Sequence, residues 1–193
     1  MRVHRLIPRT EAEGPGVRFC IWVQGCAHGC EGCFAEALWD YDKGTEVSAQ
    51  DVKRQIEAQA KQIRGVTFLG GEPFDQAAAL TEIARFAHSA GLDVIAFTGY
   101  LYETLLTRED ASQLLDDVDL LIDGPYIRAL QDFSRPLVGS SNQRFIYLTD
   151  RFTPEEIRAY RNRFELRVDP DGTVFLNGMG DLNRLRRKID NYI

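Results

Sequence analysis

The sequence predicts an α/β protein: an open partial (βα) barrel of about five to six mainly parallel strands with a C-terminal β-hairpin and helix. Short runs with apolar centres alternate with longer helical patterns along most of the 193 residues. Near-continuous apolar runs are typical of strands buried on both faces of a parallel sheet, and their alternation with helices indicates βαβ units. Near the C-terminus two short β-rich runs flank a turn, which predicts the hairpin.

Five apolar runs have the character of buried strands, which is too few to close an eight-stranded barrel. They cover residues 17–23, 65–69, 93–97, 118–122 and 144–148. The hairpin strands cover residues 165–168 and 173–176, around a turn at Asp169-Pro170-Asp171-Gly172. We expect a single domain over residues 1–193, with a core at about 14–150 and the hairpin and helix within 151–193.

Helix-start residues mark the segments between these strands. Ser48 with Asp51 predicts a capping box, and Asp75 predicts the N-cap of a helix that Gly91 ends. Further helices are expected to begin at Thr107, at Thr153-Pro154 and at Asp181.

Composition and charge exclude several classes of protein. With 44% hydrophobic and 27% charged residues, the sequence is not that of a disordered protein. No apolar run approaches the ~18 residues that span a membrane, and no secretory signal follows the first residues. There are 23 Lys and Arg against 29 Asp and Glu, a net charge of −6, which does not suit broad nucleic-acid binding. We therefore expect a cytoplasmic protein that binds neither nucleic acid nor membrane.

Three of the four cysteines lie within eight residues, directly after the first apolar run. Cys26, Cys30 and Cys33 form a C-x3-C-x2-C loop, and clustered thiols in a reducing compartment indicate metal ligands. Three thiolates can hold three irons of a four-iron cluster and leave the fourth iron open to an external ligand. A Cys3His zinc site that includes His28 and an ordinary ferredoxin-type cluster are the alternatives. Cys20, in the middle of the strand, is expected to be a buried thiol.

Unusual residues follow the other expected strands, where parallel sheets bind their ligands. Gly70-Gly71-Glu72-Pro73 follows the second strand. Thr98-Gly99-Tyr100 follows the third strand and Asp123-Gly124-Pro125 the fourth. The sequence therefore predicts an active site at this rim of the sheet.

The cysteine loop and the Gly-Gly-Glu-Pro turn, at the ends of consecutive strands, resemble the two motifs of the radical S-adenosylmethionine superfamily. Gly32 before the third cysteine and Phe34 after it are similar to the small activating enzymes of glycyl-radical enzymes, most closely those of anaerobic ribonucleotide reductase. Residues 14–18, 97–100, 122–126 and 139–143 share this resemblance. Val138 departs from it, because Arg is expected there.

The resemblance implies one 4Fe-4S cluster held by Cys26, Cys30 and Cys33, with S-adenosyl-L-methionine bound at its open iron. Reductive cleavage would give a 5′-deoxyadenosyl radical that installs a glycyl radical on a partner enzyme. The implied cofactor-binding residues are Gly32, Cys33, Phe34, Gly70, Gly71, Glu72, Thr98 and Asp123. The glycines would admit the methionine end and Glu72 would orient its ammonium group, unless Glu72 only begins a helix. The implied partners are anaerobic ribonucleotide reductase and, as electron donor, flavodoxin or ferredoxin.

Two other functions stay open at this point. One is a small-molecule radical synthase similar to 7-carboxy-7-deazaguanine synthase, which would need a closed pocket. The other is a non-catalytic iron–sulfur electron carrier, which has no use for the Gly-Gly-Glu-Pro turn. The modest length of the protein favours an activating enzyme, because a polypeptide loop has to enter an open barrel. The C-terminal hairpin and the basic helix with Arg186 and Arg187 either cover the sheet edge or dock the partner.

Overall fold

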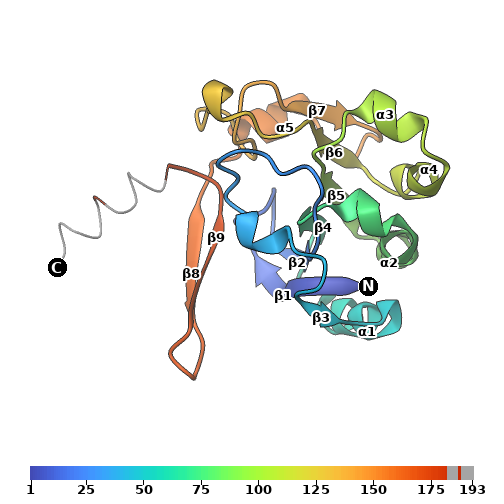
Figure 1. The fold of residues 1–193 in the computed structure, drawn as a ribbon. Helices are drawn as coiled ribbons and strands as arrows, with labels where there is room; N and C mark the ends of the chain where they lie inside the picture. Colours follow the sequence, from blue (N-terminus) through green and yellow to red (C-terminus); the bar gives the residue numbers. More distant parts are fainter. Residues whose placement is uncertain (182–186, 188–193) are drawn as a thin grey trace.

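A seven-stranded sheet forms the centre of the fold in the computed structural model, which describes residues 1–181 and 187 (Figure 1). The strand order is β3-β1-β2-β4-β5-β6-β7. The strands are β1 (Arg2–Thr10), β2 (Arg18–Val23), β3 (Thr45–Glu46), β4 (Gly65–Gly70), β5 (Asp93–Phe97), β6 (Leu120–Asp123) and β7 (Arg144–Tyr147).

The centre of the sheet is parallel and its flanks are antiparallel. Strands β2, β4, β5 and β6 are parallel neighbours, as their buried apolar runs predict. Strand β1 is antiparallel to β2 and β3, and β7 is antiparallel to β6. Among the described residues the pairing ends at two free edges, β3 and β7, so a barrel is not confirmed. The expectation of a mainly parallel sheet holds only for its centre.

Strand β1 is missing from the sequence prediction. Its buried side chains include Val3 and Ile7, four residues apart, and Arg2, Arg5 and Arg9 interrupt the apolar pattern. A strand near the edge of a sheet, with irregular pairing to β2, does not produce the continuous apolar run that marks the central strands.

Short helices connect the strands. The α-helices are α1 (Ala49–Gln59), α2 (Ala77–Ser89), α3 (Tyr102–Leu106), α4 (Glu109–Leu115) and α5 (Pro154–Ala159). The 3-10 turns are η1 (Glu36–Leu38), η2 (Pro73–Gln76) and η3 (Arg128–Leu130). None of the helices in the described part of the protein has the length and apolar character needed to cross a membrane.

Two of the expected helix starts are confirmed and two are wrong. The Ser48 and Thr153 side chains each accept a backbone N–H three residues ahead, as N-caps do. Asp75 lies inside η2, where its carboxylate accepts the hydroxyls of Tyr41 and Tyr100 instead of capping a helix. Thr107 follows the end of α3, and α4 begins at Glu109. The helix expected from Asp181 falls almost wholly outside the described residues.

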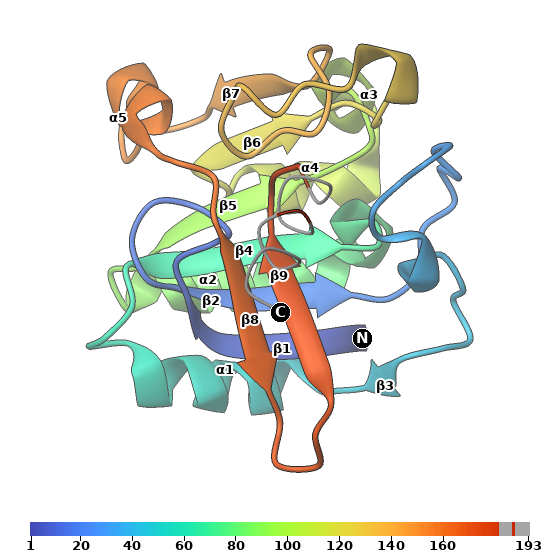
Figure 2. The ribbon, with the colours of Figure 1, turned by 90° about the vertical axis from the view of Figure 1, so that its left-hand side faces the viewer.

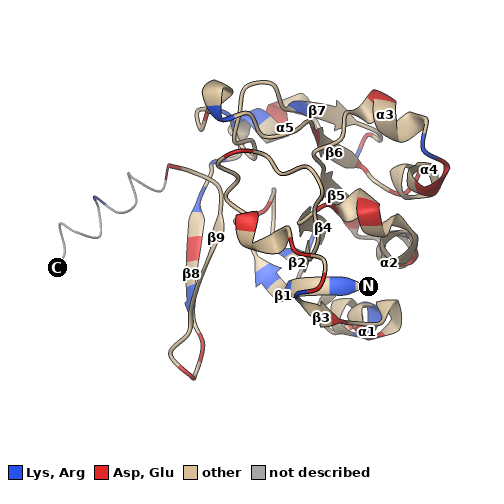
Figure 3. Ribbon diagram, viewed as in Figure 1, with Lys and Arg blue, Asp and Glu red and all other residues tan. Residues whose placement is uncertain are grey.

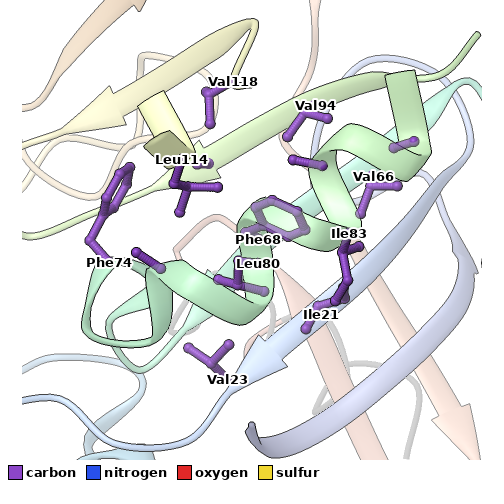
Figure 4. Close-up of a cluster of buried hydrophobic side chains, with 14 of the residues drawn as sticks. Ile21, Val23, Val66, Phe68, Phe74, Leu80, Ile83, Val94, Leu114 and Val118 are labelled. Carbon is purple, nitrogen blue, oxygen red and sulfur yellow. The ribbon is translucent and has the colours of Figure 1, made fainter. Parts of the chain in front are cut away.

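The main core lies between the sheet and the helices that cover one of its faces. Figure 4 shows Leu80 and Ile83 of α2 beside Phe68 of β4 and Ile21 of β2, and all four are fully buried. Burying a side chain of this size stabilises the fold by about 1.5–3 kcal/mol. This packed face fixes the strands, so that the loops at their carboxyl ends are held on a rigid base.

The expected hairpin is confirmed, and it lies on the other face of the sheet. It consists of β8 (Phe164–Val168) and β9 (Val174–Gly178), which form a separate two-stranded sheet. Figure 1 shows it on the face opposite α1 and α2, and Figure 2 shows it crossing in front of β1, β2 and β4. Phe175 of β9 packs against Ile7, Cys20 and Leu69.

Candidate functional site

A cavity of about 380 Å³ lies between the hairpin and the uncovered face of the sheet. At one end it is bordered by Cys26, Cys30 and Cys33, together with the glycine turn that follows β4. Residues 175–180 of the hairpin segment border it from the opposite side. The structure therefore brings the two motifs singled out in the sequence to one shared space.

The cysteine loop leaves β2 through a tightly packed glycine. The Gly25 N–H donates to the Leu38 carbonyl at 2.8 Å, and the Cys26 N–H donates to the Trp39 carbonyl at 3.1 Å. Gly25 has a φ of +100°, and a Cβ there would lie 2.2 Å from Cδ1 of Tyr41. Only glycine fits, so the base of the loop has a fixed position against the η1 segment.

The three loop thiols suit a cluster better than a single ion. No three side chains of metal-ligand type converge on one point among residues 1–181 and 187. A four-iron cluster needs no such convergence, because each thiolate binds a different iron. The Ala35 N–H donates to the Cys33 sulfur at 3.4 Å, as backbone donors do around iron–sulfur sites. Burial raises the pKa of Cys26 to about 11 and also raises the pKa of Cys30, so metal would bind with release of protons.

The glycine turn after β4 lies directly on the backbone of the cysteine loop. The Gly71 N–H donates to the Val23 carbonyl and the Glu72 N–H to the Gly25 carbonyl, each at 2.8 Å. A Cβ on Gly71 would lie 2.1 Å from the Gly25 carbonyl oxygen. The sequence prediction explained Gly71 by the approach of a cofactor. In the structure, glycine is required at position 71 because a side chain there would collide with the cysteine loop.

The Glu72 carboxylate joins three segments of the site. It is 1% exposed, and Oε1 accepts from the Phe74 N–H and the Thr98 hydroxyl, both at 2.9 Å. Oε2 accepts from the Gly99 N–H at 2.8 Å and lies 3.1 Å from Nε2 of His28. Both oxygens thus have partners within the protein. The contact of Glu72 with an ammonium group stays a prediction, while its role at the start of η2 is what the structure shows.

His28 connects the cysteine loop to the end of β5. Its ring lies edge-on to Tyr100, with centroids 4.4 Å apart, and the hydrogen bond to Glu72 raises its pKa. A Cβ on Gly99 would lie 2.5 Å from the His28 ring, so this position needs glycine. Within residues 1–181 and 187, His28 and the loop cysteines do not form a group that could hold a single metal ion, so the structure lends no support to a Cys3His zinc site. The Phe-Thr-Gly-Tyr stretch was the sequence signal for this contact.

Of the other residues predicted to bind the cofactor, some border the cavity and some do not. Cys33, Phe34, Gly70 and Thr98 border the cavity, and Phe34 is 51% exposed, in contact with Tyr126 and Phe133. Gly32 is not among the cavity-lining residues, and a Cβ there would lie 3.2 Å from Cδ of Arg128.

Asp123 is not brought to the cavity. It is fully buried, and its carboxylate accepts from the Tyr102 N–H at 2.8 Å and from Nε of Arg144 at 3.0 Å. These contacts hold the start of α3 and the pair β6–β7. The neighbouring Gly124, with a φ of +100°, borders the cavity instead. The cofactor contact that the resemblance implies for Asp123 stays a prediction.

Sequence reasoning missed the polar residues at the hairpin side of the cavity, Glu13, Trp22 and Asn177. Burial raises the pKa of Glu13 to about 7, although the hydrogen bond from Asn177 partly offsets it. The three residues come from a loop, a central strand and the hairpin, which are far apart in the sequence. Only the crossing of the hairpin over the sheet brings them together.

Comparison with known proteins finds anaerobic ribonucleoside-triphosphate reductase-activating proteins among the relatives of this chain. Residues 12–146 match the 4Fe-4S single cluster domain family. An anaerobic ribonucleoside-triphosphate reductase-activating protein of Vibrio cholerae is 32% identical over 152 residues, which make up 74% of this chain and 96% of the relative. The protein of the same name from Enterobacteria phage T4 is 32% identical over 158 residues, 78% of this chain and 96% of the relative. That of Escherichia coli (strain K12) is 29% identical over 150 residues, with 74% and 96% covered.

Proposed function

This chain belongs to the family of the anaerobic ribonucleoside-triphosphate reductase-activating proteins, and from that premise we propose which residues carry the activity and what they bind. The protein is an activating enzyme of the radical S-adenosylmethionine type. Its target is an anaerobic ribonucleoside-triphosphate reductase, on which it installs a glycyl radical.

The observation that carries this proposal is the cavity shared by the cysteine loop and the glycine turn. Cys26, Cys30 and Cys33 would hold the 4Fe-4S cluster, because all three border the cavity from one short loop. S-adenosylmethionine would lie beside them, against Gly70 and Gly71, which border the same cavity. The chemistry that these cofactors supply when bound is reductive cleavage to methionine and a 5′-deoxyadenosyl radical.

The residues of the protein position the reactants and exclude water from them. Glu72 fixes the cysteine loop, through His28, to the ends of β4 and β5, so that the loop and the cofactor site keep one relative position. The hairpin crosses the open face of the sheet and separates the cavity from solvent on that side. A carbon radical abstracts hydrogen from almost any C–H bond, so a shielded and rigid site is what the reaction requires.

The relatives favour this function over the two alternatives left open by the sequence. Each carries the name of a protein that activates a reductase, neither that of a small-molecule synthase nor that of an electron carrier. The reducing electron would come from a flavodoxin or a ferredoxin.

Anaerobic reconstitution tests the proposal. The protein with its cluster should hold about four irons per molecule. When reduced, it should form 5′-deoxyadenosine from S-adenosylmethionine. It should also generate a glycyl radical on the partner reductase, measured by electron paramagnetic resonance. Cleavage without a radical on the reductase would show that the target is a different molecule.

Single cysteine variants test the assignment of the ligands. Cys26→Ala, Cys30→Ala and Cys33→Ala should each lose the cluster absorbance, because two thiolates on this loop do not retain it. Cys20→Ala is the matched control, since this thiol is fully buried in β2 against Ile7 and Leu69. Loss of the cluster in Cys20→Ala alone would contradict the assignment.

A further inference from the structure

The hairpin β8–β9 borders the cavity but lies beyond the segment that matches the family. The match ends at residue 146, and β8 begins at Phe164. Within the described residues the hairpin has no ladder to the seven-stranded sheet and forms a sheet of its own. Figure 2 shows it in front of β1, β2 and β4, so it closes a side of the cavity that the sheet leaves open. The hairpin therefore adds a wall to the cavity from outside the matched segment.

The hairpin differs from an ordinary covering sheet in where its apolar side chains lie. Most of its aliphatic residues are on the face away from the central sheet. The facing pairs Leu166–Leu176 and Val168–Val174 share one face of the hairpin; Leu166 on that face is 56% exposed, while Leu176 also borders the cavity. The alternate pairs, Glu165–Asn177 and Arg167–Phe175, face the sheet because side chains alternate along a strand. The face that an ordinary hairpin would make apolar here carries polar groups toward the cavity and β1.

Two polar atoms at this side of the cavity have no hydrogen-bond partner among residues 1–181 and 187. Asn177 is 2% exposed, and its Nδ2 donates to Oγ1 of Thr10 at 3.0 Å and to Oε1 of Glu13 at 3.1 Å. With Nδ2 donating to these two oxygens, Oδ1 has no donor among the described residues. Nε1 of Trp22, which can only donate, is also buried and unpaired. Phe175 links the two residues, since its ring meets the Trp22 ring edge-on at 6.2 Å.

Unpaired buried polar atoms are rare, because each costs about 1–3 kcal/mol. Here one is an acceptor and one is a donor, both belong to residues that border the same cavity, and they come from opposite walls. A peptide backbone offers the complementary set, one N–H and one carbonyl per residue. The described residues that border the cavity include His4 and His28 but no Lys or Arg, so the groups present favour a neutral ligand over an anion.

We propose that the hairpin is the outer wall of the target-binding site, and that Oδ1 of Asn177 and Nε1 of Trp22 bind a backbone N–H and a backbone carbonyl of the polypeptide held there. The proposal rests on the proposed function, because a reductase target has to present a glycine-containing segment to the cavity. It adds the binding residues and the chemical group that they recognise.

Two exposed ion pairs contribute little to the attachment of the hairpin. Arg5 pairs with Asp169 at 2.8 Å, and Arg163 pairs with Glu11, and in both pairs the side chains are partly exposed. Figure 3 shows basic residues along β1 and alternating charges along β8. Exposed pairs contribute about 0–1 kcal/mol each. The hairpin is held mainly by the buried hydrogen bonds of Asn177 and by the packing of Phe175, so the entering polypeptide meets the two unpaired atoms with the hairpin in place.

A backbone methylation scan tests the proposal on the protein with its cluster. The probe is a fluorescein-labelled peptide that matches the glycine segment of the partner reductase, and affinity is measured by fluorescence anisotropy. Each peptide N–H is replaced in turn by N–CH₃. For the wild-type protein, one position should weaken binding about tenfold, the value of one lost hydrogen bond.

Variants of Asn177 and Trp22 show which of the two side chains binds the methylated N–H. Asn177→Leu should bind the unmodified peptide about tenfold more weakly and show no further loss at the sensitive position. Trp22→Phe should weaken binding similarly and keep the sensitivity to methylation. Leu166→Asn, on the outward face of β8, is the matched control and should bind like the wild type.

Three results would overturn the proposal: no sensitive position in the wild type, the same sensitivity in Asn177→Leu, or no binding of the peptide at all. The scan of the wild type needs no variant, so a folding defect does not obscure it. Formation of 5′-deoxyadenosine by the wild-type protein without a partner is measured in parallel. Its absence would count against the proposed function, whereas the methylation pattern alone decides the further inference.

Discussion

At the scale of single residues, Gly71 has the most demanding position in the site. A Cβ there would lie 2.1 Å from the Gly25 carbonyl, immediately before the first loop cysteine. Gly71→Ala should therefore displace the loop and reduce both cluster content and cofactor affinity. The sequence alone predicts a loss of cofactor affinity with the cluster retained. Iron analysis and S-adenosylmethionine binding separate the two.

Gly91→Ala is the control for this substitution. Gly91 follows α2 with a φ of +78°, and a Cβ there meets no atom within 4 Å. This variant should lose about 1–2 kcal/mol of stability from backbone strain but keep its iron. Full iron content in Gly71→Ala would show that the loop does not depend on this contact.

Glu13 should make stability depend on pH. Its pKa is raised from 4.5 to about 7, mainly by burial, and the nearby Glu165 carboxylate adds to the increase. A carboxyl that binds its proton more tightly in the folded state stabilises the fold below its unfolded pKa. That contribution is lost as pH rises from about 4.5 to about 7. The loss would be about 3 kcal/mol at most.

Glu13→Gln removes this titration. The difference between wild type and variant in the free energy of unfolding should change between pH 5 and 7 and stay constant above about 8. Anaerobic urea unfolding of both proteins with their clusters measures it, and the comparison cancels the shared effect of the cluster. A difference that does not vary with pH would contradict the assignment.

At the scale of elements, one buried arginine joins three of the parallel strands. Arg18 of β2 is fully buried; it donates to Oγ1 of Thr67 at 2.6 Å and to the Val66 carbonyl at 2.7 Å on β4, and pairs with Asp93 of β5 at 2.7 Å. Arg18→Met should cost about 3 kcal/mol, because it leaves buried acceptors unpaired.

The matched control is Arg54→Met on α1. Arg54 pairs with Asp51, but its side chain is 67% exposed, so the loss should stay below about 1 kcal/mol. Urea unfolding of the two variants gives the comparison. Equal losses would show that the contacts of Arg18 do not stabilise the strands more than a surface pair does.

The predictability of each element follows from whether its signal is local. Strand β4 and the cap at Ser48 are local patterns, and both are confirmed. Strand β1 is irregular and charged, and the direction of β7 depends on its pairing, so neither has a clear local signal. The cysteine loop and the glycine turn were brought together as predicted, because both follow parallel strands.

Other parts of the site depend on tertiary structure alone. Asp123 also ends a parallel strand, yet its carboxylate accepts hydrogen bonds from Arg144 and from the Tyr102 N–H at the start of α3. Asn177 becomes a cavity residue only because β9 crosses the sheet. The local sequence around Asp123 and Asn177 does not indicate that the first lies away from the cavity and the second borders it.

At the scale of the whole molecule, the hairpin is separable from the core. Over the described residues, the two larger buried clusters contain no hairpin residue, and only Phe175 packs against the third. Asn162, just before the hairpin, is bonded to the Leu137 N–H and to the Arg135 carbonyl, so it belongs to the core. The relatives are covered almost completely by matches that leave about a quarter of this protein unmatched.

A protein that ends after Asn162 should therefore fold. It should unfold cooperatively, at a lower urea concentration than the full-length protein, because it loses the contacts of Phe175 with Trp22 and Arg5. Its cluster should still be reconstituted, since no hydrogen bond of the cysteine loop comes from the hairpin among the described residues. Circular dichroism and iron content measure both. A truncated protein that does not fold would mean that the hairpin closes the core itself. In that case the polar groups on its inner face would have to serve packing rather than a ligand.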